Sequence, residues 1–271
     1  MDAAQDLDVL ARFKDAQKQA WAHYAPLEVA TTPTAARLVR HAGVRTGQRV
    51  LDVACGTGVV AVTAARLGAR VTGLDLTPEL LERARENSRI AKTKIDWHEG
   101  DVEKLPFEDA AFDAVLSQFG HIFAPRPDVA LAEMLRVLKP GGTIAFSTWP
   151  PELMTGRTFT LVGRYMPPPP ANVSPPHLWG DPNVVRERFG TAVRDIVFDS
   201  GRRTIAALSP EHYRHHVEQH AGPVIRLVES LSTTDPDRLE AFRREFEQLV
   251  ETYLVENEVH QDFLLTRATK I

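Results

Sequence analysis

The chain has 271 residues, which suits one large or two small domains and supports a sizeable buried core. Its 32 basic and 36 acidic residues give a formal net charge of −4, without a basic block that would attract nucleic acid or an anionic membrane. A single cysteine excludes an intrachain disulfide, and neither a signal peptide nor a membrane-spanning apolar run is visible, so we expect a cytoplasmic protein without nucleic-acid or membrane partners.

The first segment of the chain has the pattern of an amphipathic helix. Apolar side chains recur at helical spacing between Leu7 and Tyr24, ahead of any predicted strand. Such a helix is free to cap the sheet, and its aromatic residues either cover a ligand or anchor the core. Thr32 and Pro33 are typical of a helix start, so we expect a second helix from there to His41.

Residues 50–67 change from an apolar, β-branched run to glycines and then to small helix-forming residues. This pattern predicts a strand, a tight loop at Gly56 and Gly58, and a helix. A second strand at residues 70–75 completes a βαβ unit with parallel strands. Asp75 ends that strand where nucleotide-binding folds place the acid that binds ribose hydroxyls, so we favour a ligand site over a bare turn.

Asp52, at the carboxyl end of the first strand, narrows the choice of nucleotide. A carboxylate beside a pyrophosphate is repelled, which disfavours NAD, whereas it suits the ammonium and sulfonium groups of S-adenosylmethionine. The loop also lacks a third glycine and has Ala61 in its place. An NAD-dependent oxidoreductase is therefore the weaker alternative.

The remaining regular elements follow from periodicity and turn residues. They are helices at 78–90, 127–138, 210–229 and 236–257 and strands at 95–98, 111–118, 142–149, 193–198 and 263–269. The alternation of strands and helices predicts an α/β, Rossmann-like, doubly wound sheet of seven strands.

Residues 151–192 interrupt this alternation with proline runs, among them 167–170, set among aromatic residues. The segment is too apolar for a linker and too rich in proline for a helix. We interpret it as a substrate-side lid in which Tyr165, His177 and Trp179 offer surfaces to an apolar or aromatic ligand. An ordinary surface loop is the alternative.

Two groups of histidines are candidates for chemistry. His121 follows the fourth strand at the carboxyl edge of the sheet and is the best candidate for a catalytic base, with a structural role as the alternative. His212, His216 and His220 share one helical face. Without cysteine or acidic partners they favour a polar face or a pocket wall, so we predict no metal site.

Four motifs occur in order along the chain: LDVACGTG at 51–58, GLD at 73–75, GDVEKLPF at 100–107 and LRVLKPGG at 135–142. Together they resemble the class I S-adenosylmethionine-dependent methyltransferases, most nearly the ubiquinone/menaquinone C-methyltransferase-like branch with its methyltransferase type 11 domain. The motifs cover about residues 45–150. They are specific for the cofactor and the fold but not for the methyl acceptor.

The resemblance implies a sheet in the order 3-2-1-4-5-7-6 with an antiparallel last strand. It also implies S-adenosyl-L-methionine as cofactor and S-adenosyl-L-homocysteine as product. The implied cofactor-binding residues are Tyr24, Asp52, Ala54, Gly56, Gly58, Asp75, Leu76, Asp101, Val102, Ser117 and Gln118. Phe123 joins the three lid residues on the substrate side.

We expect a single methyltransferase domain over residues 1–271. Its parts would be an N-terminal cap at 1–32, a cofactor-binding core at 33–150, the lid at 151–192, and C-terminal helices and last strands at 193–271. DNA-methylating enzymes of this fold carry signature residues that this chain lacks, and its one cysteine, Cys55, lies in the glycine loop. We therefore expect methylation of a small, apolar or aromatic molecule, with a non-catalytic S-adenosylmethionine-binding module as a further alternative.

Overall fold

An eight-stranded sheet runs through the computed structural model, which describes residues 3–170 and 173–271, with side chains from residue 8 onward. Residues 1, 2, 171 and 172, which fall in the predicted cap and lid, lie outside the described residues. The strands are β1 Arg49–Val53, β2 Arg70–Asp75, β3 Ile95–Glu99, β4 Phe112–Gln118, β5 Leu138–Thr148, β6 Val193–Ala206, β7 Leu254–Val255 and β8 Glu258–Lys270.

The strand order is β3-β2-β1-β4-β5-β8-β6, and the short β7 pairs with β8 outside this path. Strands β1 to β5 pair in parallel, whereas β8 is antiparallel to both β5 and β6. The predicted order of the seven principal strands and the antiparallel last strand are thus confirmed. The structure adds one strand to the predicted seven: the two-residue β7, which forms a hairpin with β8.

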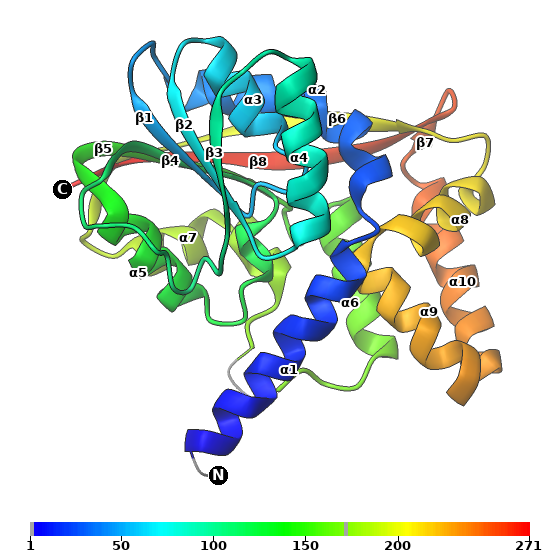
Figure 1. Cartoon of the computed structure of the whole chain (residues 1–271). Coiled ribbons are helices and arrows are strands. Elements are labelled where there is room, and N and C mark those ends of the chain that lie inside the picture. The colour runs from blue at the N-terminus through cyan, green and yellow to red at the C-terminus, as the bar shows by residue number, and fades with distance from the viewer. Residues whose placement is uncertain (1–2, 171–172) are drawn as a thin grey trace.

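Helices cover both faces of the sheet, with α2, α3 and α4 on one side and α5 and α7 on the other (Figure 1). Helices α8, α9 and α10 gather beside the ends of the long strands β6 and β8 near Ala206 and Glu258, α6 lies next to them, and α1 extends away from them toward the N-terminus (Figure 1). The bounds are α1 Ala3–Trp21, α2 Glu28–His41, α3 Val59–Arg66, α4 Pro78–Ile90, α5 Pro127–Val137, α6 Met154–Tyr165, α7 Pro182–Phe189, α8 Pro210–His220, α9 Gly222–Thr234 and α10 Pro236–Glu251.

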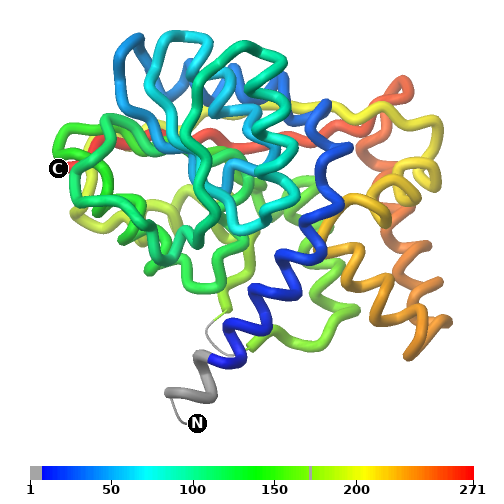
Figure 2. Tube along the Cα trace, viewed as in Figure 1, coloured from blue at the N-terminus to red at the C-terminus, as the bar shows by residue number. Residues whose placement is uncertain are grey.

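The buried apolar side chains form two clusters. The first lies between the sheet and the helices on its two faces, and the second lies among α6, α8, α9 and α10. Strand β8 belongs to both, because Phe263 and Leu265 pack in the first cluster and Val259 in the second. The Cα trace in Figure 2 shows how the β6–β8 pair reaches from the sheet into this helical region.

Helix α2 begins earlier than predicted, at Glu28, and includes Pro33 in its second turn. Proline lacks the amide hydrogen that would bond the carbonyl four residues earlier, on Val29, whose side chain is largely exposed. The carbonyl of Glu28 accepts hydrogen bonds from the hydroxyls of Thr31 and Thr32. The predicted start at Thr32 was therefore wrong by one turn, since the proline removes a single backbone hydrogen bond and the carbonyl that loses it lies on the exposed Val29.

Two further predicted elements differ from the structure. The segment 151–192 contains the helix α6, whose residues include no proline, because the prolines all lie before or after it. The predicted helix 210–229 is two helices that meet at Ala221, where the backbone is extended. Pro223 starts the second of them within its first turn, where a missing amide hydrogen costs nothing.

Strand β6 contains a bulge near its start. Its register against β8 shifts by one residue between Arg194 and Val197, and Asp195 has a left-handed backbone with φ of 54°. Beyond the bulge, Arg203 lies opposite Gln261.

Candidate functional site

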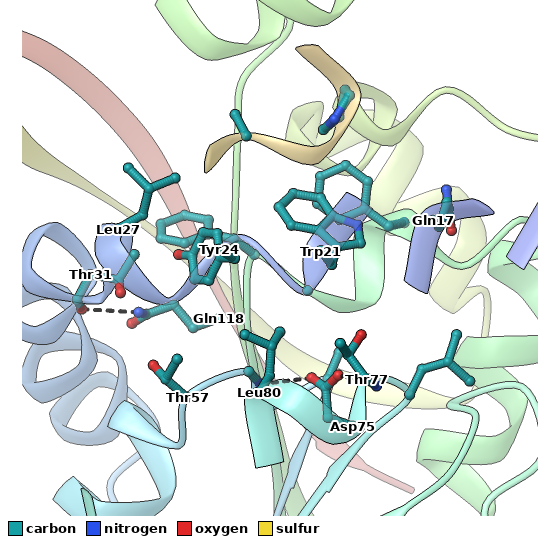
Figure 3. Close-up of a pocket in the computed structure, with 18 of the residues that line it drawn as sticks. Gln17, Trp21, Tyr24, Leu27, Thr31, Thr57, Asp75, Thr77, Leu80 and Gln118 are labelled. Atoms are coloured by element: carbon teal, nitrogen blue, oxygen red, sulfur yellow. Dashed lines mark hydrogen bonds between the residues drawn. The ribbon is translucent and has the colours of Figure 1, made fainter. Parts of the chain in front are cut away.

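A cavity begins at the carboxyl ends of β1 and β2 and continues between the helices of the second cluster. Its first part, here the cleft, is drawn in Figure 3: Trp21 and Tyr24 lie across it from Thr57, Asp75 and Leu80. Its second part, here the inner chamber, is lined by Phe119, Trp149, Thr155, Thr158, Phe159, Arg203, Ile205, Tyr213, Phe246 and Gln261.

The glycine loop shapes one wall of the cleft. Gly56 and Gly58 have left-handed backbones, with φ of 54° and 78°. A Cβ on Gly56 would meet no other atom within 4 Å, so this residue leaves open space at the cavity. A Cβ on Gly58 would lie 2.5 Å from the ring of Trp97, and Gly58 does not line the cavity. The structure thus gives Gly58 a packing role, not the predicted ligand contact.

Asp75 lies at the carboxyl end of β2 and is 7% exposed. Its Oδ2 accepts the backbone amide of Gly56 at 2.7 Å, and its Oδ1 accepts that of Thr77 at 2.9 Å. Burial raises the pKa of this carboxyl, and the two amide hydrogen bonds oppose the rise. Each oxygen keeps a further lone pair, so the carboxylate can accept hydrogen bonds from a diol in the cleft.

Two acceptors that line the cleft lack hydrogen-bond partners among the described residues. Asp52, 1% exposed, accepts the amide of Ala61 through Oδ2 at 3.0 Å, while its Oδ1 is buried and unpaired. Gln118 donates to the carbonyl of Thr31 at 3.0 Å, and its Oε1 is unpaired (Figure 3). Burial raises the pKa of Asp52 well above its usual range. A cationic donor in the cleft would relieve both unpaired acceptors.

Helix α1 is held over the cleft by ion pairs. Lys14 donates to Asp101 at 2.5 Å and to Glu103 at 2.6 Å, and Lys18 donates to Glu99 at 2.8 Å. The side chain of Glu103 is 1% exposed. Asp101, a predicted cofactor-binding residue, lines the cleft, and one of its carboxylate oxygens accepts from Lys14 on the helix.

Most of the predicted cofactor-binding residues line the cavity. They are Tyr24, Asp52, Ala54, Gly56, Asp75, Leu76, Asp101, Val102 and Gln118. Ser117 does not, because it is fully buried and its hydroxyl donates to the carbonyl of Val53 at 2.9 Å. That bond joins neighbouring strands of the sheet, so Ser117 has a structural role in place of the predicted contact.

His121, the predicted base, is fully buried outside the cavity, which corrects that prediction. Its ring lies 4.7 Å from Phe146 and 4.8 Å from Trp179, and its ring nitrogens have no hydrogen-bond partner among the described residues. Burial, with a smaller effect of the charge on Arg188, lowers the pKa of His121 to about 3. His121 does follow β4 at the carboxyl edge of the sheet. A 3₁₀ turn at 121–123, however, points its side chain into the core.

Among the predicted substrate residues, Phe123 lines the cavity, between Trp21 at 4.6 Å and Phe159 at 5.8 Å. The other three lie elsewhere. Tyr165 donates to Glu245 at 2.6 Å, and Trp179 is buried in the first core. His177 lies beside it in the turn 176–180, off the cavity. The lid segment reaches the cavity through α6 instead, which the sequence did not predict.

Sequence reasoning missed the polar wall of the inner chamber: Arg203 on β6, Tyr213 on α8 and Gln261 on β8. Two sequence patterns indicated buried faces on these elements: the alternation of residues along β6 and the spacing of Tyr213 and Val217 on α8. Neither signal shows which face of an element meets the chamber.

His216 and His220 are neighbours on the histidine face of α8. They lie 4.8 Å apart, ring to ring. In the part of the chain that the structure describes, no three His, Cys, Asp or Glu side chains are arranged to hold a metal ion. Across residues 3–170 and 173–271, no helix has the length and apolar character needed to cross a membrane.

Comparisons with known proteins point to one family. Residues 51–146 match the family model described as a methyltransferase domain. An uncharacterised protein of Mycobacterium tuberculosis is 35% identical over 257 residues, which cover 93% of each chain. The demethylmenaquinone methyltransferase of Deinococcus radiodurans is 38% identical over 125 residues, 45% of this chain and 52% of the relative.

A solved structure shares the fold. It is phosphoethanolamine N-methyltransferase 2 of Haemonchus contortus in complex with S-adenosyl-L-methionine, with a TM-score of 0.55 and 19% identity. The match covers 88% of this chain and 52% of that one. The matched family segment contains the cleft residues from Asp52 to Gln118 and ends before α6, so the walls that α6, β6, α8 and β8 give to the inner chamber lie outside it.

Proposed function

This chain belongs to the class I S-adenosylmethionine-dependent methyltransferases, and from that premise we propose that it methylates a small, flat, apolar or aromatic molecule held in the inner chamber. One observation carries the proposal: the cleft and the inner chamber are parts of the same cavity. A molecule seated among Phe119, Phe159 and Phe246 would therefore lie next to the cofactor without crossing solvent.

The residues of the cleft fit S-adenosylmethionine, which supplies an electrophilic methyl group on a cationic sulfur. Asp75 would accept hydrogen bonds from the ribose hydroxyls. The unpaired oxygens of Asp52 and Gln118 would accept from the ammonium group. The cap, residues 1–32, would cover the cleft through Trp21 and Tyr24, which line it.

The inner chamber would hold the acceptor away from water, but no carboxylate or histidine among the described residues lines it as a base. In the described part of the chain, the carboxylates and histidines that line the cavity are Asp52, Asp75 and Asp101, all in the cleft. The residues of the chamber would therefore align the acceptor with the methyl group and exclude water, which accounts for much of the rate of such a displacement. The acceptor would therefore enter the chamber as a ready nucleophile, having lost any proton beforehand in solvent.

Incubation of the full chain with methyl-labelled S-adenosylmethionine and a fractionated small-molecule extract tests the proposal. We expect S-adenosylhomocysteine to form together with a labelled, organic-soluble product, and formation of both to fall in the Asp75→Ala variant. Label in protein or nucleic acid alone would contradict the proposed acceptor class. Tight binding of S-adenosylhomocysteine without turnover of any fraction would favour a non-catalytic module.

A further inference from the structure

The wall of the inner chamber contains an arginine, Arg203, held against aromatic rings. Its Cζ lies 4.7 Å from the ring centroid of Trp149 and 5.6 Å from that of Phe119. The two rings stack on each other with centroids 4.0 Å apart. Stacking on such rings fixes the plane of a guanidinium group, so the positive charge has a defined place in the wall.

A chain of hydrogen bonds orients the polar groups of this wall. Arg203 donates through Nε to Oε1 of Gln261 at 2.5 Å, and Gln261 donates through Nε2 to Oη of Tyr213 at 2.7 Å. Gln261 is 3% exposed and Tyr213 also 3%. Because Tyr213 accepts in this chain, its own hydroxyl proton is free for a ligand oxygen. Burial raises the pKa of Tyr213 to about 12, which keeps the hydroxyl a donor.

In the part of the chain that the structure describes, the charge on Arg203 has no counter-ion. Among the described residues no carboxylate lies within ion-pair distance of it, and its two terminal nitrogens donate to no protein group. The neighbouring Arg202, by contrast, pairs with Asp262 at 2.6 Å on the outer side of the strand. A part-buried cation without a partner is costly, and a ligand that brings a negative charge removes that cost.

We propose that the methyl acceptor is an acid: an aromatic or conjugated apolar molecule whose carboxylate is bound by Arg203 and the hydroxyl of Tyr213. The planar guanidinium matches the two oxygens of a carboxylate, and the stacked rings beside it match a flat body. Gln261 is a positioning residue, because it orients both donors. This inference rests on the proposed function, since it names the acceptor of that reaction.

The test uses two probes of nearly equal shape, 2-naphthoate and its neutral amide, 2-naphthamide. Calorimetry on the full chain saturated with S-adenosylhomocysteine should show naphthoate binding at least about tenfold more tightly than the amide. Arg203→Met should remove this preference, while Arg202→Met, which changes the adjacent arginine on the other face, should keep it. Equal affinities in the wild type, or a preference that survives Arg203→Met, would overturn the proposal.

Two further measurements keep the outcomes separate. Binding of S-adenosylhomocysteine to each variant shows that it is folded, and a wild type that does not bind it would contradict the proposed function itself. If Arg203→Met fails to fold, Tyr213→Phe takes its place and should weaken naphthoate about threefold to tenfold without affecting the amide. An unchanged naphthoate affinity in that variant would also contradict the inference.

Discussion

Asp75 is the residue on which the cleft depends most directly. Its two oxygens already order the glycine loop and the start of α4 through the amides of Gly56 and Thr77. A ribose would therefore meet a carboxylate that is held in position before it binds.

We expect Asp75→Ala to weaken the binding of S-adenosylmethionine and S-adenosylhomocysteine by about tenfold to a hundredfold, because charge-assisted hydrogen bonds to the ligand are lost. Calorimetry measures the constants. Asp75→Asn is the matched control: it preserves the shape and one acceptor oxygen, and should lie between the wild type and the alanine variant. An alanine variant with wild-type affinity would mean that the ribose is held elsewhere.

His121 affects stability through its protonation. The folded pKa of about 3 lies below the usual value of 6.5, so the protein is stable with the neutral ring, and stability is lost as pH falls from 6.5 towards 3. Wild type should therefore lose about 2 kcal/mol between pH 7 and pH 5 that His121→Leu does not lose. Urea unfolding at both pH values measures this difference.

His23→Leu, which replaces an exposed histidine, is measured beside His121→Leu as the control substitution. If His121→Leu and the wild type lose stability in parallel on acidification, the buried ring has another partner. Turnover should survive in His121→Leu, because this side chain lies outside the cavity.

The cleft residues could be predicted from the sequence because their signal is local. The strand, loop and acid of the βαβ unit fix Asp52, Gly56 and Asp75 within a short stretch of chain. Arg203 and Gln261 are 58 residues apart and meet only through the pairing of β6 with β8. His121 was misplaced for a related reason: the edge of the sheet was correct, but the direction of one side chain depends on a turn of three residues.

At the scale of elements, α1 is tied to the cleft by Lys14, which bridges Asp101 and the buried Glu103. We expect Lys14→Met to raise hydrogen exchange along α1 and to weaken S-adenosylhomocysteine binding about tenfold, because the helix covers the cleft less often. Exchange followed by mass spectrometry and calorimetry give the two readouts.

Arg12→Met is the control for this helix, because Arg12 pairs with Asp8 on α1 itself and not with the cleft. Similar exchange in Lys14→Met and Arg12→Met would show that apolar contacts of α1, such as Trp21 against Phe123, hold the helix without the ion pairs.

Helix α6 shows why the segment 151–192 was wrongly judged too rich in proline for a helix. Proline content was averaged over 151–192, whereas the prolines flank a regular helix at 154–165. Met154, Leu161 and Val162 of this helix pack into the second core. The average composition of a long segment thus hides a helix that tertiary packing stabilises. Predicting the helix boundaries requires the position of each proline.

Across the whole molecule, the cofactor and the acceptor would bind in different parts of the cavity. A substitution of Phe246 tests whether the two binding functions are separable. Phe246 is fully buried on α10, lines the inner chamber and stacks 5.7 Å from Phe242. Phe246→Ala should cost about 3 kcal/mol of stability in urea unfolding and leave S-adenosylhomocysteine affinity unchanged, because Phe246 lines the inner chamber and not the cleft.

Phe242→Ala is matched to it in chemistry and burial but does not line the cavity. Both variants should be destabilised to a similar extent, whereas only Phe246→Ala should change the affinity for 2-naphthoate. A joint loss of naphthoate and S-adenosylhomocysteine binding in Phe246→Ala would show that the cores do not act separately.

The bulge at Asp195 shifts the pairing of every later residue of β6 with β8 by one position. Counted from the pair Arg194–Thr269 in unbroken register, the residue opposite Gln261 would be Arg202; the extra residue in the bulge makes it Arg203. The two adjacent arginines thus lie on opposite faces of the strand: Arg202 pairs with Asp262, and Arg203 lines the inner chamber. The side chain that stands opposite Gln261 is thereby set by a backbone irregularity that lies outside the chamber.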